Sequence, residues 1–133
     1  MDGWEGWDFQ RFYVLFVGAA FLLLGLQVFL FHWRAAFSRK SMYLPVLAAP
    51  LLAVAGIVAA ITREGVIGWI AVGVFALGVV GGLIGIVEHL RGIGYRIGGF
   101  SVRNLVAGPP PLLPATFAAV AFSGGLAILW GAL

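Results

Sequence analysis

The sequence predicts an all-α integral membrane protein with four transmembrane helices in one antiparallel bundle. Of its 133 residues, 62% are hydrophobic and 10% are charged, which leaves too few polar side chains to cover a water-soluble surface. The apolar residues also gather into four runs, each about the 20 residues that a helix needs to cross a bilayer. These runs are 12–32, 44–62, 66–90 and 112–133. We therefore predict a single four-helix transmembrane domain over 1–133.

The first run, 12–32, follows an acidic segment that contains Asp2, Glu5 and Asp8. A cleavable signal peptide begins with basic residues and ends in a small-residue cleavage site. This run has neither feature, so we expect it to remain as the first transmembrane helix.

Small residues recur at helical spacing along all four runs. Transmembrane helices associate through grooves lined by such residues, because lipid tails are as apolar as leucine and give no hydrophobic driving force. The run 66–90 is the richest in them, and we predict that its glycines dock a helix of another integral membrane subunit. The small residues in chain order are Gly18, Gly25, Ala49, Ala53, Gly56, Ala60, Gly78, Gly82, Gly85, Ala121 and Gly125.

The basic residues alternate from one side of the predicted membrane to the other. Six of the eight lie in the first and third connecting segments. The positive-inside rule places these segments in the cytoplasm and both termini outside, in the inner (cytoplasmic) membrane of the cell. Their charge indicates contact with anionic lipids and no binding of nucleic acid. The six residues are Arg34, Arg39, Lys40, Arg91, Arg96 and Arg103.

The third connecting segment, 91–111, is longer than a simple connection requires. Its apolar residues alternate with glycine and arginine on either side of Gly98-Gly99, a pattern that predicts a short β-hairpin in this cytoplasmic loop. A hairpin of this size is not stable alone, so we expect it to lie on the membrane surface or to dock a partner protein. The expected docking residues are Tyr95, Arg96, Phe100 and Arg103.

Two histidines, His32 and His89, end the first and third runs on the same predicted side of the membrane. Two imidazoles across a gap, with glycines that make room for a macrocycle, are typical of b-type haem. The alternative is that each imidazole only interacts with the dipole at its helix C-terminus.

A polar cluster follows at the end of the third run. Glu88, Arg91 and Tyr95 combine hydrogen-bond donors and an acceptor beside apolar residues, which suits the head of a quinone or of a lipid. Glu88 and Arg91 are also spaced to form an ion pair on one helix.

Several classes of chemistry lack the residues they need. The chain has no cysteine and no ionisable residue near the middle of a run, so thiolate sites, proton pumps and ion-coupled transporters are not expected. No metal-ligand or nucleophile–base spacing is present. We therefore predict a non-enzymatic accessory or scaffold subunit of a larger, energy-transducing complex, respiratory or photosynthetic. The alternative is an electron-transfer protein that binds haem b or quinone through His32 and His89.

Overall fold

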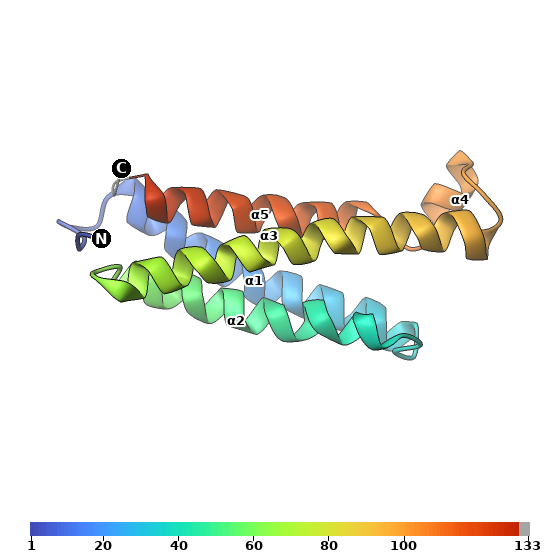
Figure 1. Ribbon diagram of the computed structural model, residues 1–133, viewed down its shortest axis with the longest axis horizontal. Helices are drawn as coiled ribbons and strands as arrows, with labels where there is room; N and C mark the ends of the chain where they lie inside the picture. The colour runs from blue at the N-terminus through green and yellow to red at the C-terminus, as the bar shows by residue number, and fades with distance from the viewer. Residues whose placement is uncertain (131–133) are drawn as a thin grey trace.

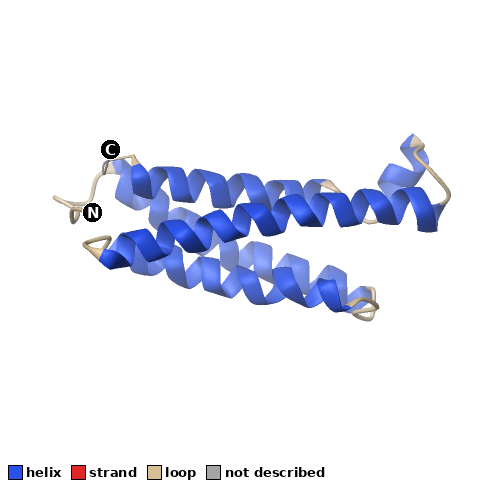
Figure 2. Cartoon of the chain, viewed as in Figure 1, coloured by secondary structure: helices blue, strands red, loops and turns tan. Residues whose placement is uncertain are grey.

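The computed structural model describes residues 1–130 of the chain, and every regular element among them is a helix (Figures 1 and 2). The long helices are α1 (Phe9–Arg34), α2 (Tyr43–Ile61), α3 (Val66–Gly92) and α5 (Leu112–Leu129). The short elements are the 3₁₀ turn η1 (Lys40–Met42), the π-helical η2 (Ile93–Ile97) and α4 (Val102–Ala107).

Four stretches are long and apolar enough to cross a membrane: Phe9–Arg34, Lys40–Ile61, Val66–Ile97 and Leu112–Leu129. The all-helical class with four such helices is confirmed, and it supports a multi-pass membrane protein. The first helix begins three residues before the predicted start, because the Asp8 carboxylate caps it by accepting a hydrogen bond from the Arg11 amide at 2.8 Å. The end of the run 112–133 lies outside the described residues.

The four long helices lie side by side in two close pairs, α1 with α2 and α3 with α5 (Figure 1). The N-terminus, the last turn of α5 and the α2–α3 turn lie at one end of the molecule, here called the terminal end. The α1–α2 turn and α4 lie at the opposite end, here called the loop end.

Glycines allow the close approach within each pair. A Cβ atom on Gly18 of α1 would lie 2.8 Å from the backbone nitrogen of Ile57 in α2. A Cβ on Gly82 of α3 would lie 2.7 Å from the Cβ of Ala118 in α5. Both distances are shorter than van der Waals contact, so only glycine fits where these helices touch.

Aromatic side chains fill the centre of the bundle. The ring of Phe21 is fully buried and lies edge-on to Phe117, with 5.0 Å between the ring centroids. Phe75 is also fully buried, and its ring centroid lies 6.1 Å from that of Phe21. Residues of three helices therefore meet in one apolar core, as dispersion contacts favour.

The glycine stripe of α3 belongs to this internal packing and not to the docking surface that the sequence predicts. Cβ atoms on Gly78, Gly82 and Gly85 would each lie within 3 Å of a side chain of α2 or α5. The partner helix that fills the groove is thus supplied by the chain itself.

The predicted β-hairpin is wrong, because the segment after Gly92 is helical. Ile93–Ile97 continue α3 as a π-helix, and Ile93 is fully buried. Gly98 and Gly99 do form the expected turn, with φ of 102° and 104°, but the turn ends a helix instead of joining two strands. Ser101 then caps α4 by accepting a hydrogen bond from the Asn104 amide at 3.1 Å.

Candidate functional site

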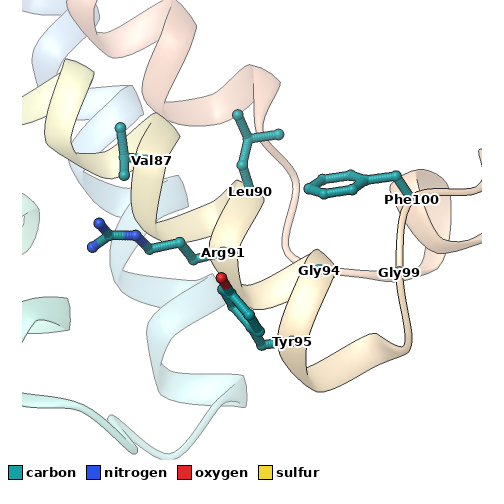
Figure 3. Close-up of a pocket in the computed structure, with 7 residues that line it drawn as sticks. All are labelled: Val87, Leu90, Arg91, Gly94, Tyr95, Gly99 and Phe100. Atoms are coloured by element: carbon teal, nitrogen blue, oxygen red, sulfur yellow. The ribbon is translucent and has the colours of Figure 1, made fainter.

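An open groove at the loop end has a volume of about 440 Å³ (Figure 3). We call it the interfacial groove. Its wall comes from the last turns of α3, from η2 and from the turn that leads to α4. The lining residues are Val87, Leu90, Arg91, Gly94, Tyr95, Gly99 and Phe100.

Helical spacing brings most of these residues to one face. Val87, Arg91 and Tyr95 follow one another at steps of four residues, which places them along one stripe. Figure 3 shows the Arg91 and Tyr95 side chains on one side of the groove and the Phe100 ring on the other, directed toward Leu90. Tyr95 is 89% exposed and Phe100 68% exposed, so both are accessible to a ligand.

Glycines shape the wall opposite the arginine. A Cβ on Gly94 would lie 3.3 Å from the Phe100 ring, so the missing side chain lets this ring lie close to the helix. The positive φ of Gly99 turns the chain back at this point. The groove therefore depends on Gly94 and Gly99 as much as on its large side chains.

The single carboxylate near the groove is shared between two arginines. Glu88 Oε2 accepts from Arg39 Nη1 at 3.0 Å, and Glu88 Oε1 accepts from Arg91 Nη1 at 3.3 Å. The pairing of Glu88 with Arg91 matches the expected spacing, whereas Arg39 arrives from the α1–α2 turn and was not expected. Because Arg91 has five N–H donors and makes one bond to Glu88, the others are free to bind an anion.

Both histidines donate through Nδ1 to backbone carbonyls. His32 Nδ1 lies 2.7 Å from the oxygen of Val28, and His89 Nδ1 lies 2.8 Å from the oxygen of Pro110. A carbonyl oxygen only accepts, so each Nδ1 carries a proton and Nε2 is the ring nitrogen left for a ligand. Metal-ligating histidines commonly hold their rings by the same kind of hydrogen bond, from the other ring nitrogen to a carbonyl.

The glycines expected to make room for a haem beside these histidines pack against neighbouring helices. A Cβ on Gly25 would lie 2.9 Å from the Cβ of Ala49, so the stripe of α1 faces α2. The stripe of α3 faces α5 at Gly82 and Gly85. The two glycine stripes therefore pack against different helices at these positions.

At the terminal end, side chains of the N-terminal region cap the exposed carbonyls of α2. Trp4 Nε1 donates to Ala59 O at 2.7 Å, and Arg11 Nε donates to Ala60 O at 2.7 Å. The last carbonyls of a helix have no partner within it and carry partial negative charge, so these donors stabilise the helix end.

Arg63 has a similar role for α5. It is 7% exposed, and its guanidinium donates to Ile128 O and to Asp2 O, both at 3.2 Å. The same guanidinium lies 3.9 Å from the centroid of the Trp4 ring. Arg11 and Arg63 are thus both used within the chain, while the other six basic residues lie at the loop end.

The residues expected to dock a partner fall into three places. Tyr95 and Phe100 line the interfacial groove, Arg103 lies exposed on α4, and Arg96 extends back over Gly92, with Nη2 3.0 Å from the position of a Cβ there. Val87 and Leu90 also line the groove and were not predicted. Their spacing of four residues from Arg91 and Gly94 was the available signal.

No known protein family, no curated protein and no solved structure matches this chain. Its function must therefore be argued from the geometry of its own residues.

Proposed function

We propose that this chain is a small non-catalytic accessory or scaffold subunit of a larger membrane complex, which it contacts through α4. The four long helices form an antiparallel bundle in the inner (cytoplasmic) membrane with both termini outside. Other integral membrane subunits are the partners, and α4 with Arg96 and Arg103 forms the docking surface.

The single observation that supports this proposal is the apolar surface of α4. Val102 is 80% exposed and Val106 is 83% exposed. Figure 1 shows α4 beside the last turns of α3 and past the start of α5, and its close contacts are with η2. An apolar helix that its own chain does not cover is a feature of interaction surfaces.

The charge distribution supports the orientation. The loop end carries six basic side chains against one carboxylate, Glu88, whereas the terminal end carries two basic side chains against four acidic ones. The terminal end is therefore net negative, and the net positive charge lies at the loop end. The positive-inside rule assigns such an end to the cytoplasm.

The test is purification of the tagged chain from its native membrane in mild detergent, with mass spectrometry of the proteins that co-elute. We expect Val106→Asp to release the partner, because it places a charge in an apolar contact. Val66→Asp is the matched control, since Val66 is 67% exposed at the opposite end of the molecule. Co-elution of no partner with the wild type, or equal loss in both variants, would contradict docking through α4.

A second candidate is an electron-transfer protein that binds haem b or quinone. The observation in its favour is that His32 and His89 both direct Nδ1–H to carbonyls and leave Nε2 for a ligand. The filled glycine stripes favour the accessory subunit over this candidate. A visible absorption spectrum of the protein purified from its native membrane tests for b-type haem, which absorbs strongly there, and the ultraviolet spectrum of its organic extract tests for quinone.

A further inference from the structure

We propose that the interfacial groove binds one anionic phospholipid. Arg91 and Tyr95 hold the headgroup phosphate, and an acyl chain lies against Val87 and Leu90 and under Phe100. The proposal goes beyond the accessory role, because it rests on the groove and does not need a protein partner on α4.

The depth of the groove fits a lipid that crosses from headgroup to hydrocarbon. The helical stretch Val66–Ile97 has 32 residues and is about 48 Å long, whereas the hydrocarbon core is about 30 Å thick. The excess length lies at the loop end, where α3 extends past the start of α5 (Figure 1). The outer part of the groove therefore lies at headgroup level.

A hydrogen bond relates the level of the groove to the start of α5, where the hydrocarbon core of the membrane ends in this proposal. His89 Nδ1 donates to Pro110 O at 2.8 Å, which aligns His89 with the start of α5 at Leu112. Val87 and Leu90 are at that level, and Arg91 and Tyr95 follow toward the headgroups. The groove thus changes from apolar to polar in the same direction as a phospholipid does.

The charge of the groove selects an anionic headgroup. Glu88 is the only carboxylate at the loop end and is shared by Arg39 and Arg91, so this trio carries net positive charge. Guanidinium groups bind phosphate oxygens through charge-assisted hydrogen bonds. The Tyr95 hydroxyl adds a donor, and its amphipathic ring suits the interface.

The test uses the full chain, purified in non-ionic detergent and delipidated, with bound lipid counted by native mass spectrometry. Phosphatidylglycerol and phosphatidylcholine with the same acyl chains are the two probes. We expect the wild type to bind one phosphatidylglycerol about tenfold more tightly than phosphatidylcholine. Arg91→Gln should weaken phosphatidylglycerol binding by about tenfold, because it removes charge-assisted hydrogen bonds to the phosphate.

Two further variants separate the groove from general surface charge. Arg103→Gln makes the same charge change on α4, outside the lining residues, and should change the affinity by less than about twofold. Leu90→Trp keeps every charge but fills the groove, so it should weaken the binding of both lipids. Thermal unfolding of each variant shows whether it is folded when the lipid is counted.

Three results would overturn the proposal. Equal loss in Arg91→Gln and Arg103→Gln would mean that diffuse positive charge attracts the lipid. Unchanged binding in a folded Leu90→Trp would exclude the groove. Displacement of phosphatidylglycerol by millimolar inorganic phosphate would identify a free anion as the ligand. None of these results depends on whether α4 docks a protein.

Discussion

At the scale of single residues, the contact at Gly82 makes the sharpest prediction about stability. A Cβ at this position would lie 2.8 Å from the backbone nitrogen of Ala118, and backbone cannot move aside as a side chain can. Gly82→Leu should therefore separate α3 from α5 and destabilise the chain by about 1–3 kcal/mol or more. Thermal unfolding in detergent, followed by circular dichroism, measures the effect.

The neighbouring glycine supplies the control. A Cβ on Gly81 would meet no atom within 4 Å, so Gly81→Leu adds the same side chain on an open face. We expect its stability to stay within about 0.5 kcal/mol of the wild type. If the two leucine variants unfold at the same temperature, close backbone contact at Gly82 does not hold α3 to α5.

At the scale of elements, the long apolar runs predicted the spans, whereas the two-residue alternation after the third run wrongly predicted strands. Long apolar runs leave few alternatives to a membrane-crossing helix, so all four predicted starts agree with the structure within three residues. In 93–97 a two-residue alternation and the end of a helical stripe look alike over five residues. Ile93 is fully buried by tertiary contacts. Local periodicity carries no information about those contacts, which favour the helix.

The difference between local spacing and long-range contact also explains which parts of the groove could be predicted from the sequence. Glu88, Arg91 and Tyr95 are near in sequence, and their neighbourhood followed from helical spacing alone. Arg39 reaches Glu88 from 49 residues away, and nothing in either local pattern specifies that pairing. The direction of each glycine stripe likewise depends on which helix packs beside it.

The N-terminal segment gives a prediction at this scale. Arg63 joins it to the bundle through Asp2 O, Ile128 O and the Trp4 ring. Arg63→Gln should lower stability by about 1.5–3 kcal/mol, because buried hydrogen bonds to a charged group are lost. It should also make residues 1–8 more sensitive to limited proteolysis.

Arg34→Gln is the control for that experiment, since Arg34 is exposed in the last turn of α1 at the loop end. It should leave the cleavage rate of residues 1–8 unchanged. If Arg63→Gln is cleaved no faster than Arg34→Gln, the contacts of Arg63 are not what holds the segment to the bundle.

At the scale of the whole molecule, the asymmetry of charge predicts how the chain crosses the membrane. The native sequence has no cysteine, so single cysteines can be introduced as unique labels at exposed positions at the two ends. A membrane-impermeant maleimide should label Gly6→Cys in intact cells, and should label Ser38→Cys and Ala107→Cys only after permeabilisation. Labelling of Gly6→Cys and Ser38→Cys from the same side would contradict a first span over α1, whereas the reverse pattern would contradict the orientation.

The positive charge of the first loop gives a second prediction about orientation. Neutralising Arg34, Arg39 and Lys40 together should produce a population with both orientations in the membrane, because the charge of this loop acts on the orientation when the first helix inserts. The same substitutions at Arg11 and Arg63 should not invert the chain, since those two guanidinium groups lie at the terminal end, where acidic residues are in excess.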